Sequence, residues 1–540
     1  MTEMQLPLLP LGISDFETLR DDGRIYVDKT GLVCELACSK GKYLLARPRR
    51  FGKSLLVSTF ESLFRNGTRD FKGLEAEKLW TDRTYRVLHL DFSIAASFST
   101  REGFLQQFAV MLEAAAIRGG FEIPERSQNP ISNLCLFIAA QPKSSLVLLI
   151  DEYDAPLTNH LDEPGLFSEI QECLNTLYAS VKALSRSLRF FFMTGITKFS
   201  HTGIFSAFND LIDISLDEKY GALLGCTEDE IRRFFGGYLF RAAAELGISE
   251  ESLLERLRSS YDGFCFDKKA STHVFCPWSV LRFLDAPGKG FENYWYKSGG
   301  QPSVLMKCLA GHGLANPDSF AEFRELPLAD LEAVSSIGDM KFEALMTLAG
   351  YLTIKETKDD GYAVLGYPNA EVAESIARLY ADELLKGKSW IREGGVSVSS
   401  VLAAGTLTDA VQLFDQAINA IDCKDFPVTN EAVCRSHIQI LLYGAQIRPV
   451  AEGHSARGRS DLEFDAGSRH WVLEFKYAKD ASETVRKLEE GLAQIRSRRY
   501  GVSLSGKKLF RAALVFDGSE RRFTAFAQAE EDSPAKEEQA

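Results

Sequence analysis

The stretch ARPRRFGKSLL at residues 46–56 decides how the first half of the chain is interpreted. Its GKS at 52–54 matches the end of the phosphate-binding pattern G-x-x-x-x-G-K-[ST]. Arg47 stands where that pattern has its first glycine, so the loop either begins differently or matches by accident. The flanking residues favour a phosphate loop, because the apolar run 42–46 predicts a strand and 54–64 predicts a helix.

A loop between a strand and a helix would direct backbone N–H groups of the helix N-terminus toward a phosphate. Lys53 would reach the β- and γ-phosphates of ATP, and Ser54 would ligate Mg²⁺. Gly52 would allow the main chain to approach the ligand closely. The sequence therefore predicts a nucleotide site at this loop.

Two later apolar runs end in polar residues that suit the same site. LVLLIDE places Asp151 and Glu152 at the end of one predicted strand, and RFFFMTG places Thr194 near the end of another. Asp151 could hold Mg²⁺ directly or through water, and Glu152 could position or deprotonate the attacking water. Thr194 could sense the γ-phosphate. An accidental GKS with a solvated strand end is the alternative, but three pieces in this order favour an ATP site.

The first 225 residues predict an α/β fold. Fully apolar strands alternating with helices indicate a parallel sheet covered by helices on both faces, as in a P-loop NTPase. The predicted strands are 42–46, 85–92, 145–152 and 188–195, and the predicted helices include 54–64 and 101–117. Helical patterns dominate after that and indicate a helical lid or middle region. We divide the chain into 1–225, 226–400, a C-terminal α/β domain at 401–525 and an acidic, disordered tail at 526–540.

Composition describes an ordinary globular chain, with 45% hydrophobic and 25% charged residues among 540. No apolar run approaches the roughly 20 residues of a membrane helix, so no membrane partner is expected. Ten scattered cysteines without a C-x-x-C pair favour reduced thiols and a cytoplasmic location. The net charge of −13 argues against a nucleic-acid-coated protein, yet residues 430–525 hold 17 Lys and Arg against 12 Asp and Glu. That basic segment points to a polyanionic partner.

Residues 458–479, GRSDLEFDAGSRHWVLEFKYAK, predict a β-hairpin, because two alternating runs flank a glycine-containing turn. If the loop is the Gly-Ser pair at 467–468, Asp461 faces Glu474 across the hairpin, about 5 Å apart at Cβ. Lys476 then lies on the same face, two residues beyond Glu474. The apolar residues on the opposite face, which suits a core, are Leu462, Phe464, Leu473 and Phe475.

Two carboxylates and a lysine on one face can form a metal-dependent phosphodiesterase site. Asp461 and Glu474 would bind Mg²⁺ or Mn²⁺ together with the carbonyl of Phe475, and the metal would activate water and polarise a phosphodiester. Lys476 would orient the water or neutralise developing charge. A cross-strand salt-bridge cluster on an exposed sheet face has the same spacing, so spacing alone does not choose between the two.

The first half resembles the AAA-ATPase-like family of prokaryotic NTPases over roughly residues 8–310. The motifs that carry the resemblance are YVDKTGLVCEL, YLLARPRRFGKSLLVSTFESLF, LLIDEYDAPL, GITKFSHTGIFSAFNDL, YDGFCF and CPWSVLRFL. Members commonly carry R-P-R-R-F-G-K-[ST], so Arg47 is similar to the family's own version of the loop. In GITKF, Lys198 would serve the γ-phosphate or a regulatory contact, or be a surface lysine.

The resemblance implies that the whole loop contacts the nucleotide. The loop residues assigned to ATP are Arg47, Pro48, Arg49, Arg50, Phe51, Gly52, Lys53, Ser54 and Leu55. Pro48 fixes one φ angle and can replace part of the first glycine's role in shaping the turn. Arg49 and Arg50 would add positive charge beside the phosphates, or form a solvated basic turn.

The C-terminal motifs GRSDLEF and WVLEFKYAK resemble the PD-(D/E)XK nuclease superfamily, a restriction-endonuclease-like fold, over roughly residues 425–525. The resemblance implies a D…E-x-K core, an early helical acid and a later helix. The residues that match these parts are Asp461, Glu474, Lys476, Glu431, Gln494 and Tyr500. Ser460 departs from the proline of some members. The arginines that could contact phosphates, or be solvated, are Arg457, Arg459, Arg496, Arg498 and Arg499.

These observations predict an ATP-dependent AAA-like engine followed by a helical region and a metal-dependent nuclease-like domain acting on nucleic acid, with DNA favoured. The rival prediction is an ATP-regulated switch or interaction protein whose C-terminal module binds nucleic acid without cutting it. Because AAA-type enzymes often form rings, a homo-oligomer is a further expectation, although the sequence shows no unmistakable arginine finger.

Overall fold

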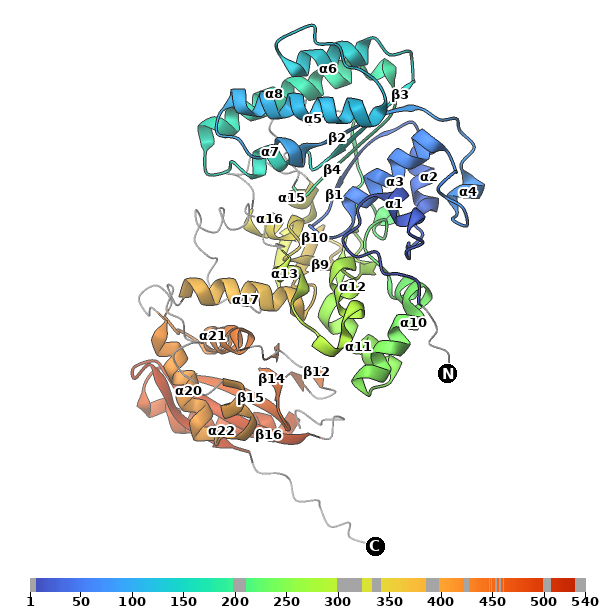
Figure 1. Ribbon diagram of the computed structural model, residues 1–540. Helices are drawn as coiled ribbons and strands as arrows, with labels where there is room; N and C mark the ends of the chain where they lie inside the picture. The colour runs from blue at the N-terminus through green and yellow to red at the C-terminus, as the bar shows by residue number, and fades with distance from the viewer. Residues whose placement is uncertain are drawn as a thin grey trace. The chain divides into compact units, whose positions relative to one another are not determined.

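The computed structural model divides the chain into two compact units (Figure 1). One comprises Met1–Gly311 with Phe323–Val372, and the other comprises His312–Glu322 with Ala373–Ala540. The residues that the structure describes are 6–197, 210–298, 323–332, 341–384, 398–421, 427–445, 447, 449–451, 454–455, 458–459, 461–498 and 507–529.

The first unit is built on a five-stranded parallel sheet in the order β2-β3-β4-β1-β5. The strands are β1 Lys42–Ala46, β2 Arg86–Asp91, β3 Leu146–Asp151, β4 Leu188–Gly195 and β5 Ile212–Asp213. The four strands predicted from the apolar runs are confirmed as parallel neighbours. β5 was not predicted, because it has only two residues, both exposed, and therefore shows no apolar run.

Helices cover both faces of this sheet, as the uninterrupted apolar strands predict. On β4, Phe191 and Met193 join a core with α5, α6 and α8, whereas Phe190 and Phe192 contact Phe60 of α3. Figure 1 shows these two groups of helices on opposite sides of the strands. The helices are α3 Lys53–Asn66, α5 Arg101–Gly119, α6 Pro130–Ala139 and α8 Pro164–Ala183.

Shorter helices join these elements. They are α1 Phe16–Asp21, α2 Thr30–Cys38, α4 Ala76–Leu79, α7 Ala155–Thr158 and the 3-10 turns η1 Phe92–Ala95, η2 Ser185–Ser187, η3 Glu218–Tyr220 and η4 Pro287–Lys289.

The middle region is helical as predicted, but it also contains strands that were not predicted. Its helices in the first unit are α10 Glu228–Leu246, α11 Glu250–Tyr261, α12 Pro277–Asp285, α13 Tyr294–Lys297, α15 Leu328–Glu332 and α16 Phe342–Leu348. Its strands are β6 Phe264–Cys265, paired with β7 His273–Val274, and the antiparallel set β8 Arg324–Pro327, β10 Tyr362–Gly366 and β9 Thr353–Thr357. These strands have five residues or fewer, too few for an alternating pattern to stand out from helical neighbours.

The second unit contains a five-stranded sheet in the order β11-β14-β15-β16-β17. The strands are β11 Val450–Ala451, β14 Leu462–Ala466, β15 Arg469–Ala478, β16 Lys508–Asp517 and β17 Arg522–Gln528, and a separate pair consists of β12 His454–Ser455 and β13 Gly458–Arg459. β15 and β16 are parallel neighbours joined through α22, whereas the other pairs in the five-stranded sheet are antiparallel. The helices are α19 Val398–Ala404, α20 Leu407–Ala420, α21 Glu431–Gly444 and α22 Ala481–Arg498, and α17 Ala370–Leu384 precedes them.

The predicted hairpin and its register are confirmed. Ala466 pairs with Arg469 and Leu462 pairs with Leu473, so the loop contains two residues. Gly467 adopts a φ of 57°, the left-handed conformation that such tight turns require and that glycine adopts without steric cost. The predicted apolar face is also confirmed, because its four side chains are buried in a core with α20 and α21. The polar face therefore points to the other side of the sheet.

Candidate active sites

The phosphate loop lies between β1 and α3. Gly52, with a φ of 92°, is the N-cap of α3, and the helix begins at Lys53. The Lys53 ammonium is 7% exposed and donates to the carbonyl oxygens of Arg47 and Pro48, at 3.0 Å each. Burial lowers the pKa of Lys53, while the carboxylates of Asp151 and Glu152 oppose that change. A lysine held by loop carbonyls at a helix N-terminus is placed to exchange them for phosphate oxygens.

Arg47 has a different role from the one predicted for it. Its side chain is 1% exposed and donates to the carbonyl oxygens of Ser215 (2.5 Å) and Tyr220 (3.1 Å), and its guanidinium lies over the Phe266 ring. This placement corrects the expectation of a nucleotide contact from the Arg47 side chain, because the guanidinium anchors the loop to the protein interior. The resemblance to a family loop could not distinguish an anchor from a ligand.

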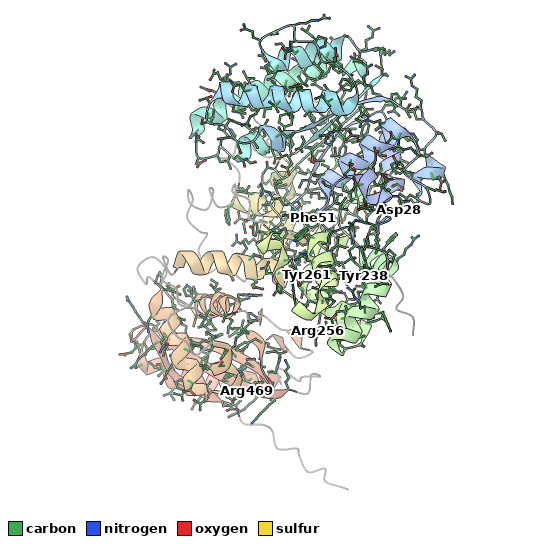
Figure 2. The ribbon with its side chains drawn as sticks, viewed as in Figure 1. Asp28, Phe51, Tyr238, Arg256, Tyr261 and Arg469 are labelled. Atoms are coloured by element: carbon green, nitrogen blue, oxygen red, sulfur yellow. The ribbon has the colours of Figure 1, made fainter. Side chains whose placement is uncertain are left out.

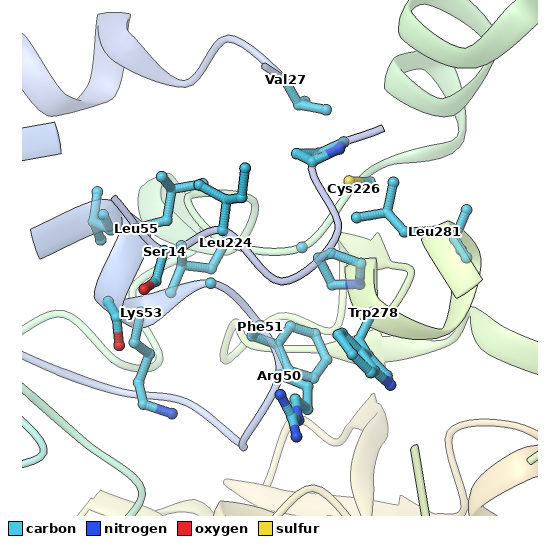
Figure 3. A pocket seen from close by; sticks show the side chains of 18 of the residues that line it. Ser14, Val27, Arg50, Phe51, Lys53, Leu55, Leu224, Cys226, Trp278 and Leu281 are labelled. Atoms are coloured by element: carbon cyan, nitrogen blue, oxygen red, sulfur yellow. The ribbon is translucent and has the colours of Figure 1, made fainter. Parts of the chain in front are cut away.

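A cavity of about 690 Å³ opens in front of the loop (Figure 3). Arg49 to Leu56 line one side, and Glu152 reaches the same space. Two further walls, which were not predicted, come from the N-terminal segment and the middle region. Their residues include Pro10, Gly12, Ile13, Val27, Lys29, Leu224, Ile231, Phe235, Trp278 and Leu281. Val27 and Lys29 belong to the motif YVDKTGLVCEL, and Trp278 and Leu281 belong to CPWSVLRFL, so the family resemblance could have drawn attention to them.

An ion pair connects the wall from the N-terminal segment to the wall from the middle region. The Lys29 ammonium contacts both carboxylate oxygens of Glu230, at 2.5 and 2.6 Å. Glu230 also accepts a hydrogen bond from the N–H of Thr227, which completes the N-terminal cap of α10. The walls of the cavity are otherwise mainly apolar, which suits a flat base, while the loop end is polar and basic, which suits phosphates.

The predicted acids, Asp151 and Glu152, lie at the carboxyl end of β3, beside Thr194 near the end of the neighbouring strand β4. Thr194 Oγ1 donates to Oδ1 of Asp151, and the N–H of Glu152 donates to the same oxygen at 3.0 Å. Glu152 adopts a φ of 51°, an unusual conformation for a residue with a Cβ. Burial and the neighbouring Asp151 carboxylate raise the pKa of Glu152. The arrangement places one carboxylate to hold a cation and the next to accept a proton.

A third acid, Asp154, was not predicted to matter. It is 2% exposed and accepts hydrogen bonds from the N–H groups of Ile196 (3.0 Å) and Thr197 (2.7 Å) and from the Thr197 hydroxyl (2.6 Å). Asp154 therefore fixes the segment that follows β4. Its signal in the sequence is the second aspartate of DEYD. Lys198, the next residue of that segment, lies outside the described residues.

The C-terminal residues predicted from the hairpin also meet. The Lys476 ammonium contacts Oε1 of Glu474 at 3.0 Å and Oε2 of Glu431 at 3.4 Å. Oδ2 of Asp461 accepts a hydrogen bond from the N–H of Phe475 at 2.8 Å. Because the N–H and C=O of a strand residue point to the same side, the Phe475 carbonyl faces the Asp461 edge. The carboxylates and the predicted carbonyl ligand thus share one corner of the sheet.

The electrostatics of this corner fit a cation. Oε2 of Glu474 is buried and lacks a hydrogen-bond partner among the described residues, an arrangement that a bound cation would satisfy. Burial and the neighbouring Asp461 carboxylate raise the pKa of Glu474 to about 7, and burial also raises the pKa of Asp461. Burial opposes the Lys476 charge, but the Glu474 and Glu431 carboxylates outweigh it and raise the Lys476 pKa.

A cation at this corner would rely on few protein ligands. No cluster of three or more His, Cys, Asp or Glu side chains with metal-binding geometry occurs in the part of the chain that the structure describes. Asp461, Glu474 and the Phe475 carbonyl would therefore be completed by water or substrate oxygens, which suits Mg²⁺ because it usually keeps several waters.

Two helices complete the corner. Glu431 opens α21, and Arg435, one turn later, places its guanidinium 3.9 Å from Oδ1 of Asp461. Arg435 was not predicted, although its i, i+4 spacing from Glu431 is a signal for a shared helix face. On α22, a Cβ added at Gly491 would lie 3.5 Å from Cγ of Lys476, so this helix packs closely over the pair. Gln494 lies three residues later on α22 and is partly buried.

The predicted phosphate contacts are only partly described. Arg496 is exposed on α22, and Arg459 and Arg498 lie in regular elements without described side chains. The residues that lie outside the described ones are Arg457, Ser460, Arg499 and Tyr500. None of the helices in the described part of the chain combines the length and apolar character that crossing a membrane requires.

The fold and the two sites define a class of protein that joins a P-loop sheet to an α/β domain with a D…E-x-K corner. Residues 10–205 match the family described as Predicted AAA-ATPase, and residues 430–526 match the PD-(D/E)XK nuclease superfamily. A relative from Azotobacter chroococcum mcd 1, described as "Uncharacterized protein in vnfD 5'region", is 30% identical over 486 residues, covering 87% of this chain and 89% of the relative. The chain belongs to the AAA-ATPase-like family and carries a C-terminal PD-(D/E)XK nuclease superfamily domain.

We expect Mg²⁺ affinity to increase as the pH rises from about 6 to about 8, because a proton on Glu474 competes with the cation. In the absence of metal, the free energy of unfolding should decrease as the pH rises. The raised carboxyl pKa means that the native state keeps a proton that the unfolded chain releases, so stability falls as the pH rises toward about 7. Thermal melts across this range, with and without Mg²⁺, measure both effects. In Glu474→Gln both trends should flatten, and a Mg²⁺-induced shift that is independent of pH in the wild type would contradict the prediction.

Proposed function

We propose that this protein binds and hydrolyses ATP in its first unit and cuts nucleic acid, with DNA as the favoured substrate, in its C-terminal domain. The observation that carries the proposal is the C-terminal corner, where the partly buried Asp461 lies beside the buried Glu474 and Lys476. A salt-bridge cluster would pair its carboxylate oxygens, whereas Oε2 of Glu474 is buried without a hydrogen-bond partner among the described residues. This favours the nuclease prediction over the salt-bridge alternative.

In the first unit, the loop binds the phosphates of ATP, and residues at the strand ends supply groups for hydrolysis. Lys53 leaves the carbonyls of Arg47 and Pro48 and binds the β- and γ-phosphates, while the N–H groups at the start of α3 bind the same anion. Ser54 and Asp151 would hold Mg²⁺. Glu152, with its raised pKa, accepts a proton from the attacking water, and the base occupies the apolar walls of the cavity.

In the C-terminal domain, Asp461, Glu474 and the Phe475 carbonyl would hold Mg²⁺ or Mn²⁺. A divalent cation at such a site lowers the pKa of its bound water and polarises the phosphodiester. Lys476, held between Glu474 and Glu431, places its charge beside the group that becomes more negative in the transition state. Arg435 balances the charge of Asp461 from the opposite side. Gln494 is assigned to the same site on α22.

The test is cleavage of single- and double-stranded DNA and RNA by the full chain, with and without Mg²⁺ and with and without ATP, beside phosphate release from ATP. We expect metal-dependent cleavage and measurable ATP hydrolysis. ATP hydrolysis with salt-sensitive binding but no cleavage would replace this proposal with the rival, an ATP-regulated switch whose C-terminal module only binds nucleic acid. The absence of both activities would overturn the proposal.

DNA binding by the full chain should weaken steeply with salt, because each phosphate neutralised by a basic side chain releases counterions. Arg496→Ala should reduce the slope of log affinity against log salt by about 1, while weakening all DNA sequences alike. Arg233→Ala changes an exposed arginine of the first unit and should leave the slope unchanged. Fluorescence anisotropy over a salt series measures the slopes, and binding that is insensitive to salt would remove the support for a nucleic-acid partner.

A further inference from the structure

The phosphate loop is enclosed by side chains of the middle region, all within the first unit. Phe51 is 1% exposed and contacts the rings of Phe264 and Phe266 edge to face, with centroid distances of 4.9 and 5.1 Å. The Arg50 guanidinium lies 4.5 Å from the ring centroid of Trp278, a contact that Figure 3 shows beside Phe51. These contacts come from β6, the residue that follows it, and α12, so the loop is held by elements far away in sequence.

Further contacts hold the main chain of the loop from the same side. Trp295 Nε1 donates to the carbonyl oxygen of Arg49 at 3.4 Å, and Arg50 donates to the carbonyl oxygen of Ser298 at 2.6 Å. Gly350 approaches Pro48 so closely that an added Cβ would lie 2.7 Å from the proline ring. Pro48 and Phe51 are therefore buried at the two ends of this segment, whereas Arg49 is partly exposed and Arg50 is exposed between them.

The backbone of this loop needs such support. Arg50 has a φ of 73° and Gly52 a φ of 92°, so left-handed residues stand on both sides of Phe51. Glycine adopts this conformation freely, whereas a residue with a Cβ does so at a cost. The usual first glycine of a phosphate loop is replaced by Arg47, whose side chain is fixed in the interior. The left-handed conformation of Arg50 must therefore be stabilised by contacts between the loop and other residues.

We propose that Phe264 and Phe266 are positioning residues for the phosphate loop. By enclosing the Phe51 ring, they keep Arg50 in the left-handed conformation and aim the N–H groups of 52–54 at the phosphates. Neither aromatic residue lines the cavity, so they act through Phe51 and not on the ligand. The assignment rests on the proposed ATP-binding function and gives a role to the motif YDGFCF at 261–266.

The position of this motif supports the assignment. Figure 2 labels Phe51 and Tyr261, the first residue of the motif, in the first unit, and both are almost fully buried. Gly263 has a φ of 87° and an added Cβ there would lie 2.3 Å from the carbonyl oxygen of Pro368, so the backbone before Phe264 is fixed. The Phe264 main chain also pairs with Val274 in the two-stranded sheet. The aromatic pocket for Phe51 is thus built on a rigid turn.

The test is Phe264→Leu in the full chain, with ATP and adenosine affinities measured by calorimetry. We expect about tenfold weaker ATP binding, because the loop no longer holds its N–H groups in place, and unchanged adenosine binding. Because Arg50→Gly alone also removes a charge near the phosphates, that variant is the reference: in its background Phe264→Leu should cost only about twofold in ATP affinity, since glycine adopts the required φ without cost. A core residue without a positioning role would lose ATP affinity equally in both backgrounds.

Matched variants separate the positioning effect from general destabilisation. Phe137→Leu removes a buried ring that stacks on Phe121 at 5.0 Å beside the sheet of the same unit, and should bind ATP like the wild type. Phe266→Leu should also weaken ATP binding and leave adenosine binding unchanged. This second variant tests the assignment if Phe264→Leu does not fold.

Three results would overturn the assignment, provided that the wild type binds ATP and Lys53→Ala does not. They are unchanged ATP affinity in the folded aromatic variant, equal loss of ATP and adenosine affinity, and a loss of ATP affinity in the Arg50→Gly background as large as in the wild-type background. A wild type that binds no ATP would overturn the proposed function and this assignment together.

Discussion

Asp461→Ala is expected to lose metal binding and nucleic-acid cleavage together. Asp461 supplies one of the two carboxylates at the corner, and its Oδ2 accepts the N–H of Phe475 at 2.8 Å, which fixes the carboxylate beside the predicted carbonyl ligand. Without it, Glu474 and one carbonyl would hold the cation alone. Because hydrolysis depends on metal-activated water, cleavage should fall by about 1,000-fold or more. The measurements are Mn²⁺ binding by calorimetry and metal-dependent cleavage of DNA and RNA.

The chain offers a matched control in the strand that directly follows Asp461. Asp465 of β14 is also an aspartate, but its carboxylate contacts Lys507 and His470 and none of the residues of the corner. Asp465→Ala should therefore keep metal binding and cleavage. A fully active Asp461→Ala would show that the site lies elsewhere in the chain.

Lys476→Ala should separate metal binding from chemistry. Its ammonium contacts two carboxylates and does not belong to the predicted ligand set, so much of the metal affinity should persist. The rate should fall by about 100-fold or more, because the lysine charge matters chiefly in the transition state. The exposed Lys479 provides the control substitution. If the cluster were only a set of salt bridges, the wild type would not cleave and each variant would lose about 1 kcal/mol or less of stability.

Lys53→Ala is expected to remove tight ATP binding. The lysine is buried at the N-terminus of α3 and is held by two loop carbonyls, so its charge is already at the place where phosphates would bind. Losing a charge-assisted contact to phosphate there should weaken ATP binding by about 100-fold. Calorimetric titration of ATP measures the loss, and the exposed Lys78 provides a control substitution that should have no effect.

Glu152→Gln gives the complementary result for the same site. It should keep ATP affinity, because the phosphates do not depend on this carboxylate, while phosphate release slows by about 100-fold or more without the proton acceptor. Wild-type ATP binding and hydrolysis in Lys53→Ala would show that GKS is accidental in this chain.

Local pattern predicted most of the secondary structure. The four apolar runs became parallel strands, because strands buried on both faces must be apolar throughout. The hairpin register followed from alternation and a glycine turn, since a one-residue slip would expose the core face. The β5 strand and the small sheets of the middle region were missed, because strands of so few residues carry too little pattern.

The candidate sites divide in the same way. The GKS loop, Asp151 with Glu152, and Asp461 with Glu474 and Lys476 could be predicted, because each group follows from spacing within one or two elements. Asp154 and Arg435 were not predicted, because each acts on a partner many residues away and its local signal, an extra aspartate or an i, i+4 spacing, is weak. The same limit explains the error over Arg47, whose partners Ser215 and Tyr220 are distant in sequence.

The sequence by itself determined the parallel sheet, the position of the phosphate loop and the polar face of the hairpin, because periodicity and turn chemistry act over a few residues. Tertiary structure alone decided which side chains of the loop face the cavity and which anchor the loop in the interior. It also placed the N-terminal segment and the middle region around the cavity and packed Phe264 and Phe266 against Phe51. The physical reason is that burial and hydrogen bonding between distant segments depend on the packed chain, and no local pattern records those partners.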